Sequence, residues 1–171
     1  MQRSWPTVIG ILIIALQALG FLVTLATTAS LFMDLSGVVA PFAGTAALES
    51  QKAWRTALLV SHLSVALLSL LAIAGGILLL FRRRRGVTIL LAWAALRIPH
   101  AFYAGWTNAN AQFDTMTAMP QPAGRPMPAA FNDMMYWMSF LTSVIWLLVI
   151  PTFILIWFLV PPIRRQTRLW P

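Results

Sequence analysis

The sequence predicts an all-α fold: a polytopic membrane protein built as a bundle of four transmembrane helices, with both chain termini in the cytoplasm. Of the 171 residues, 60% are hydrophobic and only 9% are charged, against about 25% charged residues in an average soluble domain. Twelve basic and four acidic side chains are too few to cover a water-soluble surface of this size. A soluble fold is therefore excluded, in line with a mean hydropathy of +0.80.

Four apolar runs have the length of roughly 20 residues that a helix needs to cross the hydrocarbon core. They cover residues 7–29, 56–81, 87–106 and 136–160 of a single membrane domain. The runs lack the alternation of barrel strands, so each is expected to be a helix whose backbone groups bond within their own segment. Only residues 82–86 join the second and third runs, which makes these two helices antiparallel neighbours.

The distribution of charge predicts the orientation, because basic residues near span ends are retained on the cytoplasmic side. One side of the bundle carries eight arginines and no acid: Arg3, Arg82, Arg83, Arg84, Arg85, Arg164, Arg165 and Arg168. The other side carries all four acids, Asp34, Glu49, Asp114 and Asp133, against three basic residues, Lys52, Arg55 and Arg125. The turn 82–86 and the tail 161–171 are therefore expected in the cytoplasm and the loops 32–55 and 107–135 outside, in a bacterial inner membrane.

The first span has an alternative interpretation as a cleaved secretory signal. Arg3, a long apolar stretch and the small residues 27–30 imitate such a signal and its cleavage site. The apolar run exceeds the usual length of roughly 7 to 15 residues, which favours a span that is retained.

The two outer loops differ in composition. The first, 32–55, mixes small and apolar residues, has a helical tendency over 45–54, and is expected to lie on the membrane surface. The second, 107–135, is expected to be extended and irregular in its middle. Its chain-breaking residues are Pro120, Pro122, Gly124, Pro126 and Pro128.

A pI near 11.8 would suggest nucleic-acid binding in a soluble protein. Here the arginines border apolar runs, so anionic lipid is the expected partner and nucleic acid is not. The predicted cytoplasmic contacts with anionic lipid are Arg82, Arg83, Arg84, Arg85, Arg164 and Arg165.

Arg97 is the only charged residue within a span, about ten residues from either end of the third, and a charge at that depth marks a functional candidate. Gln17 lies at a comparable depth in the first span. Pro99 and Pro151 each leave the carbonyl oxygen four residues upstream without its helical donor. We favour the interpretation that Arg97 binds these acceptors and pins the bundle. The alternative is an anion or lipid-headgroup site with Arg97 at its base.

His62 and His100, the only histidines, are each six residues inside the outer end of a span, on the two helices of the predicted hairpin. Facing histidines at one depth are the ligands that haem b requires in a bundle. Hydrogen bonding between helices is the interpretation we favour. Arg97 and His100 are three residues apart and share a helix face. The predicted intramembrane polar cluster is therefore Arg97, Gln17, His62 and His100.

Methionines gather in the outer part of the chain, and thioethers are soft ligands for Cu(I). A copper site would combine Met116, Met119 and Met127 with His62 and His100 beneath them. Methionine near the start of the fourth span is otherwise ordinary apolar packing.

Two segments resemble parts of a group of small uncharacterised bacterial membrane proteins with four spans. They are LLLFRRRRGVTILLAWAALRI, residues 78–98, and IPTFILIWFLVPPIRRQTRLW, residues 150–170. In that group a basic turn joins two spans, and a proline precedes a short basic tail after the last helix. The group has no assigned activity, so the resemblance implies topology and no catalytic residue.

We expect a non-enzymatic integral membrane protein that acts through contacts with membrane lipids, another membrane protein or a second copy of itself. The sequence has no phosphate-binding glycine loop, serine elbow or zinc-protease motif, and no cysteine for a disulfide or thiolate site. One alternative is small-anion or lipid-headgroup binding or transport centred on Arg97. A second is a haem b or copper protein using His62 and His100; otherwise no cofactor is expected.

Overall fold

The structure, a computed structural model, describes residues 4–30, 32, 36–118 and 128–171, with side chains described from residue 52 onward in the second helix. Its elements are α1 (Trp5–Ser30), α2 (Ser36–Leu80), α3 (Arg84–Ala118), α4 (Ala129–Leu159) and α5 (Pro161–Thr167). No strand occurs in these ranges. Four of the helices contain segments of 25 to 35 residues that are long and apolar enough to cross a membrane. The predicted all-α membrane bundle is thereby confirmed.

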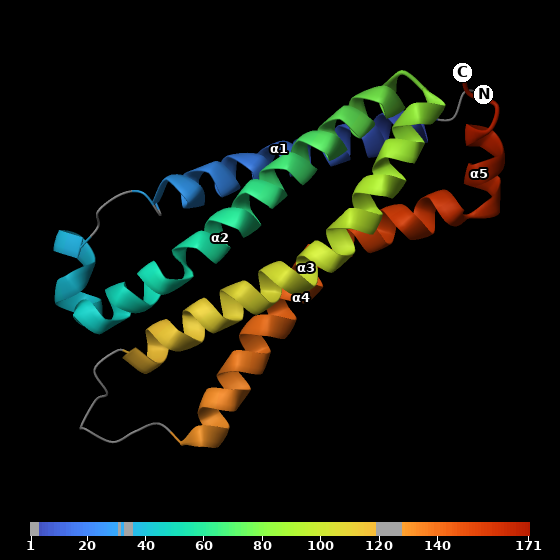
Figure 1. The fold of residues 1–171 in the computed structure, drawn as a ribbon. Helices are drawn as coiled ribbons and strands as arrows, with labels where there is room; N and C mark the ends of the chain where they lie inside the picture. The colour runs from blue at the N-terminus through green and yellow to red at the C-terminus, as the bar shows by residue number, and fades with distance from the viewer. Residues whose placement is uncertain (1–3, 31, 33–35, 119–127) are drawn as a thin grey trace.

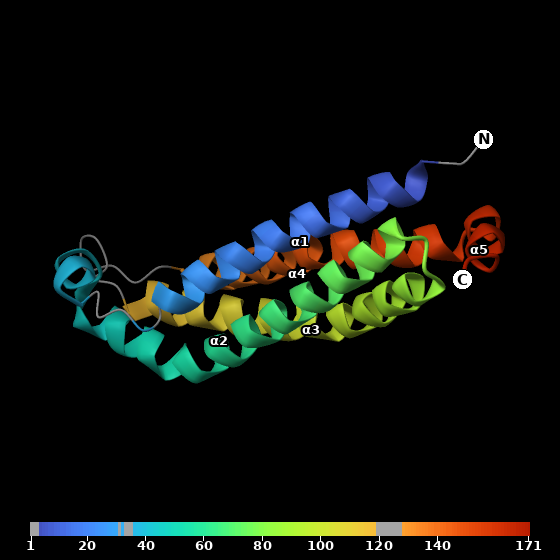
Figure 2. The same cartoon turned by 90° about the horizontal axis from the view of Figure 1, so that it is seen from above.

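The long helices follow one another up and down the bundle (Figures 1 and 2). Each packs against the next: α1 against α2, α2 against α3, and α3 against α4. The α2–α3 hairpin is confirmed, and it is tight. A Cβ atom built on Gly86 would lie 2.8 Å from the backbone nitrogen of Leu79 and 2.9 Å from the carbonyl oxygen of Gly75. Only glycine permits this approach of the two backbones.

The helices extend beyond the predicted spans. Residues 36–55, expected to be a surface loop with a helical tendency over 45–54, are helical throughout as the first part of α2, and α3 continues to Ala118. The second extension has a simple reason: residues 107–118 contain no proline or glycine, so nothing interrupts the helix after the apolar run ends. The proline-rich segment 119–127 lies outside the described residues. Pro128, which follows it, is extended, with φ −56° and ψ 137°, and α4 starts directly after it.

Pro161 and Pro162 end α4, close to the predicted end of the fourth span at residue 160, and they also begin a new helix. Val160 is extended, with φ −59° and ψ 124°, and the two prolines occupy the first positions of α5. Proline is well suited there because the first helical N–H groups have no intrahelical partner. The tail is thus a short helix folded back against the bundle (Figure 1).

This tail joins three helices at one end of the molecule. The indole Nε1 of Trp5 donates a hydrogen bond to Gln166 Oε1 at 3.0 Å, and the Trp5 ring stacks on Trp170 with centroids 5.6 Å apart. The backbone N–H of Arg84, at the start of α3, donates to the carbonyl oxygen of Pro171 at 3.0 Å. One of the orphan donors at the α3 N-terminus is satisfied in this way.

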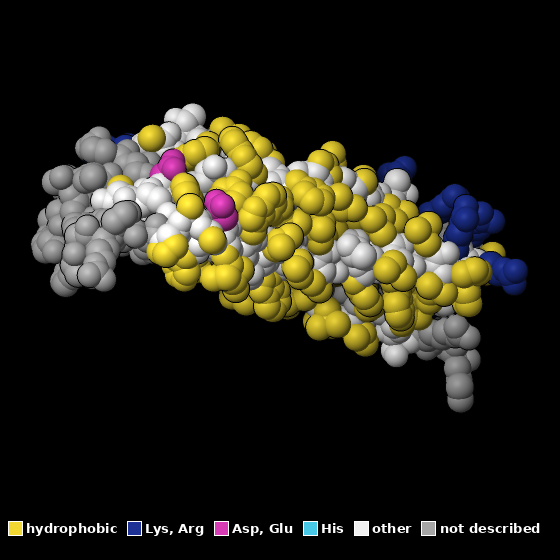
Figure 3. All heavy atoms as spheres, turned by 90° about the horizontal axis from the view of Figure 1, so that it is seen from below, with side chains coloured by type: hydrophobic (Ala, Val, Ile, Leu, Met, Phe, Trp, Pro, Cys, Tyr) yellow, Lys and Arg dark blue, Asp and Glu magenta, His cyan; other side chains and the backbone are white. Residues whose placement is uncertain are grey.

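The two ends of the bundle differ in charge. Figure 3 shows most of its lysine and arginine side chains gathered at one end, aspartate toward the other together with a further basic side chain, and hydrophobic side chains over the surface between them. We call the end that carries Arg82–Arg85, Arg164, Arg165 and Arg168 the basic end, and the end near Asp114 and Asp133 the acidic end. Arg3 lies outside the described residues. Large apolar side chains such as Leu19 and Leu22 of α1 are exposed, as expected of helices that face lipid.

The buried core lies in the half of the bundle toward the basic end. Its largest members are Trp93, Leu79, Leu90, Ile154 and Phe158, all at most 3% exposed. This core holds four helices together on one side of Arg97. The polar residues predicted to form a cluster lie beyond it.

Candidate functional site

A cavity of about 300 Å³ lies between the four long helices near the middle of the bundle. We call it the Arg97 chamber. Its polar lining comes from three helices: Gln17 and Thr24 of α1; Ser61, His62 and Ser69 of α2; Arg97 and Asn108 of α3. α4 contributes the mainly apolar Trp146, Leu147, Ile150 and Pro151. The structure thus brings Gln17, His62 and Arg97 to one cavity, with His100 bonded to Arg97 behind the wall.

Arg97 lies deep in the bundle, about 20 Å along α3 from Arg84 at the helical rise of 1.5 Å per residue. The four apolar runs, residues 7–29, 56–81, 87–106 and 136–160, contain no Asp or Glu that could neutralise it. Its Nη1 donates to His100 Nδ1 at 3.4 Å, the one hydrogen bond found for the guanidinium among the described residues. A guanidinium has five N–H donors, so four remain for a group in the chamber.

His100 connects Arg97 to the neighbouring helix. Its Nε2 lies 3.2 Å from the carbonyl oxygen of Ser61 on α2. One tautomer satisfies both contacts: Nδ1 accepts from the guanidinium, which has no acceptor, and the Nε2–H donates to the carbonyl. His100 is therefore a neutral side chain that holds Arg97 in place and links α3 to α2.

His62 has a different environment, although it lies at the same level as His100. Its ring lines the chamber, and its Nδ1 is buried without a hydrogen-bond partner in the described part of the chain. The indole Nε1 of Trp93, another lining residue, is in the same state. A buried polar group without a partner costs about 1 to 3 kcal/mol.

The pinning role predicted for Arg97 is not the arrangement found. The guanidinium bonds to His100, and within the described residues no bond joins it to Gln17 or to the carbonyls of Ala95 and Leu147. The physical reason is that Gln17 and Arg97 line the chamber from α1 and α3, so the cavity separates the groups that were expected to bond. The polar residues therefore lie around a cavity and do not form the hydrogen-bonded group that was expected.

The histidine pair does not fit haem. Bis-imidazole ligation needs a free ring nitrogen on each histidine, whereas both nitrogens of His100 are engaged, one by Arg97 and one by Ser61. In the described ranges no group of three or more His, Cys, Asp or Glu residues is placed to hold a metal ion.

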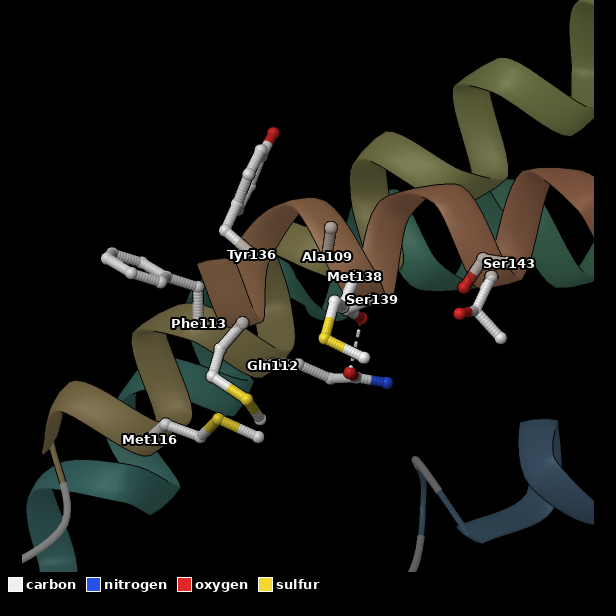
Figure 4. Close-up of a pocket in the computed structure, with 10 residues that line it drawn as sticks. Ala109, Gln112, Phe113, Met116, Tyr136, Met138, Ser139 and Ser143 are labelled. Atoms are coloured by element: carbon white, nitrogen blue, oxygen red, sulfur yellow. Dashed lines mark hydrogen bonds between the residues drawn. The ribbon is translucent and has the colours of Figure 1, made fainter. Parts of the chain in front are cut away.

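A second cavity, of about 330 Å³, lies between α3 and α4 toward the acidic end. Figure 4 shows Met116, Met138, Phe113 and Tyr136 around it, with Ser139 Oγ donating to Gln112 Oε1 at 2.6 Å. The predicted copper residues do not converge here. Met119 and Met127 lie outside the described residues, and Met116 is about 24 Å beyond His100 along α3, because the helix continues without a turn. This pocket is separate from the histidines.

Sequence reasoning missed Asn108, Ser61 and Trp93 as chamber residues. The signal for Asn108 is its spacing: it follows Arg97 by 11 residues, close to three full turns, and so lies on the same face of α3. Trp93 is one turn before Arg97 on that face. The predicted lipid-contact arginines are all at the basic end, and most are exposed: Arg83, Arg84, Arg85, Arg164 and Arg165.

No protein-family model, curated protein or solved structure matches the chain. The function must therefore be argued from the geometry of the chamber.

Proposed function

We propose that this protein is a multi-pass protein of the bacterial inner membrane that binds an anionic group in the Arg97 chamber and catalyses no reaction. One observation carries the proposal: a guanidinium in the middle of the bundle, with one hydrogen bond among the described residues, beside a cavity of about 300 Å³ that has polar side chains on three of its helices. The sequence alone favours a protein that acts only through its outer contacts. The chamber shifts our preference to the anion-binding alternative.

The chemistry of the lining favours an anion. A charge within the membrane costs about 2.5 to 3.5 kcal/mol on insertion scales, and no carboxylate lines the chamber to offset it. A phosphate or carboxylate would neutralise Arg97 and accept two parallel hydrogen bonds from its planar fork. The Gln17 amide is a further donor in the lining.

Catalysis is not part of the proposal because the chamber lacks an acid–base pair. His62 is its one lining residue that exchanges a proton near neutral pH, and no lining carboxylate orients that ring as a base. A cavity of this volume is at the small end of the range for ligand pockets. It is large enough for an anionic headgroup or a small anion.

We further propose that the basic end faces the cytoplasm, with both termini on that side. The support is the charge distribution: the arginines of the α2–α3 turn and of α5 lie together at one end, and Asp114 and Asp133 lie toward the other. In this orientation the exposed arginines meet the anionic lipids of the inner leaflet.

The anion site is tested by thermal unfolding of the purified protein in detergent with increasing inorganic phosphate. Wild type is expected to gain stability, because a ligand that binds only the folded state raises the unfolding temperature. Arg97→Gln should lose this response, and Arg97→Lys, which keeps the charge but not the fork, should keep part of it.

The matched control is Arg85→Gln, which removes an exposed arginine at the basic end. It should respond to phosphate as wild type does. An Arg97→Gln protein that is stabilised by phosphate as strongly as wild type would show that the anion binds elsewhere.

A further inference from the structure

The mouth of the Arg97 chamber lies between α1 and α4. Consecutive long helices pack along each other, but α1 and α4 are not among the closely packed pairs of the described structure. Their aromatic contacts are at the basic end, where Trp5 meets Trp157 at 6.1 Å and Phe158 at 6.2 Å between ring centroids. On this side of the chamber, no close backbone packing joins the two helices in the described structure.

Two lining residues show where the cavity reaches the surface. Leu16 of α1 and Trp146 of α4 line the chamber, yet Leu16 is 48% exposed and Trp146 is 74% exposed. A side chain that touches both the cavity and the outside marks a rim. This rim is apolar, and it lies on the part of the bundle that faces hydrocarbon.

Gly20 confirms that the rim is unobstructed. A Cβ atom built on Gly20, which lines the chamber, would meet no atom within 4 Å. The same construction on Gly10, also on α1, would bring the Cβ atom to 2.8 Å from Leu80 Cδ2. Gly10 is therefore packed against α2, whereas the surface at Gly20 is open.

The polar lining also continues along the bundle from Arg97 toward the acidic end. Asn108 lies about 16 Å beyond Arg97 on α3, and Thr24 lies about 10 Å beyond Gln17 on α1. A polar group can follow this lining while an attached hydrocarbon chain stays outside, against Leu16 and Trp146. A free hydrated anion arriving through the same mouth would have to leave water and cross hydrocarbon, which is costly.

We infer that the occupant of the Arg97 chamber is a membrane lipid with an anionic headgroup, which enters sideways between α1 and α4 and leaves its acyl chains at the rim. The inference rests on the proposed function, because it names the carrier of the anion that Arg97 binds. A lipid headgroup and a free phosphate ion would both present a phosphate group to Arg97. The experiment distinguishes these two sources.

The test compares three probes by their protection of the purified protein against thermal unfolding in detergent: short-chain phosphatidic acid, short-chain phosphatidylcholine and inorganic phosphate. Phosphatidic acid is expected to bind at least about tenfold more tightly than inorganic phosphate, since its chains add apolar contact at the rim. Phosphatidylcholine should protect least, because its headgroup carries no net negative charge.

The mouth is tested with a thiol introduced into the folded protein, since the chain has no cysteine of its own. Gly20→Cys is purified, shown to unfold at the wild-type temperature, and then alkylated with a maleimide, so that a failure to fold cannot imitate a blocked mouth. Alkylation should weaken phosphatidic acid binding by at least about tenfold. The matched control is Ala15→Cys, an exposed α1 position that does not line the chamber; its alkylation should change nothing.

The outcomes are distinguishable. Equal protection by inorganic phosphate and phosphatidic acid, or no effect of alkylation at Gly20→Cys, would overturn the lipid and leave the anion site standing. Equal protection by phosphatidylcholine would overturn the selectivity for an anionic headgroup. If every probe protects Arg97→Gln as strongly as wild type, both the proposed function and this inference are overturned.

Discussion

Arg97 Nη1 lies 3.4 Å from His100 Nδ1, one turn further along α3, and the Nε2 of His100 lies 3.2 Å from the Ser61 carbonyl oxygen on α2. The relationship fixes the direction of the guanidinium, because an imidazole bonded at both nitrogens cannot rotate without losing a contact. The other four donors of Arg97 have no hydrogen-bond partner in the part of the chain that the structure describes. His100 is therefore a positioning residue behind the chamber wall, and its removal should affect both stability and binding.

Replacing His100 with Ala is expected to destabilise the bundle by about 1 to 2 kcal/mol, since interhelical hydrogen bonds in membrane proteins contribute on this scale. Phosphate protection should weaken as well, because Arg97 loses the contact that orients it. Thermal unfolding in detergent, with and without phosphate, measures both effects. Ser64→Ala is the control: the Ser64 hydroxyl donates to the Val60 carbonyl within α2 and does not line the chamber, so wild-type behaviour is expected. A His100→Ala protein with unchanged stability and binding would contradict the positioning role.

Two glycine substitutions should have opposite effects on stability. A Cβ atom on Gly105 of α3 would lie 2.6 Å from Val144 Cγ2 on α4, so Gly105→Ala should destabilise by about 1 to 3 kcal/mol through overpacking. Gly20→Ala meets open space and should stabilise by up to about 1 kcal/mol, the difference in helix propensity. Unfolding temperatures of the two variants, measured side by side, check the pair. A destabilised Gly20→Ala protein would show that the mouth is packed.

The orientation can be read from the labelling of single cysteines by a membrane-impermeant thiol reagent applied to intact cells. Asp133→Cys, exposed near the acidic end, should react, and Arg83→Cys, exposed at the basic end, should react only after the membrane is permeabilised. Gly86 is a poor labelling position because its added Cβ would lie 2.8 Å from the Leu79 nitrogen. Reaction of Arg83→Cys alone in intact cells would invert the topology.

Haem added to the purified protein is expected to give no bis-imidazole spectrum. Iron ligation would require His100 to release Arg97 or Ser61, which leaves a buried donor or carbonyl without a partner. A visible absorption titration is the measurement, with His62→Ala and His100→Ala as controls that should match wild type. A Soret shift in wild type that either substitution abolishes would contradict this reading of the histidines.

The sequence predicts the helices well because each rests on local information. The apolar runs, Pro161 and the short turn before Gly86 predict three helix ends and one pair of neighbours without reference to the rest of the chain. The presence of Gln17, His62 and Arg97 at one cavity also follows from depth and spacing. Depth and spacing do not show whether these side chains touch one another, because contact across helices depends on the distance between α1 and α3. α1 packs closely against α2 at Gly10 and Gly76, toward the basic end, and this packing cannot be predicted from the residues around Arg97.

The hydrogen bond between His100 and the Ser61 carbonyl has a consequence for how the protein is made. Arg97 is the costly residue to move into lipid, and the His100 that bonds it is anchored on α2, the helix synthesised just before. If α3 entered the bilayer alone, the Arg97 guanidinium would enter before His100 could bond to α2. Entry of α2 and α3 as a closed hairpin, with the arginines of the turn held back at the basic end, lets the polar contacts form before the charge loses its water. The tight α2–α3 approach at Gly86 is what makes such a paired insertion possible.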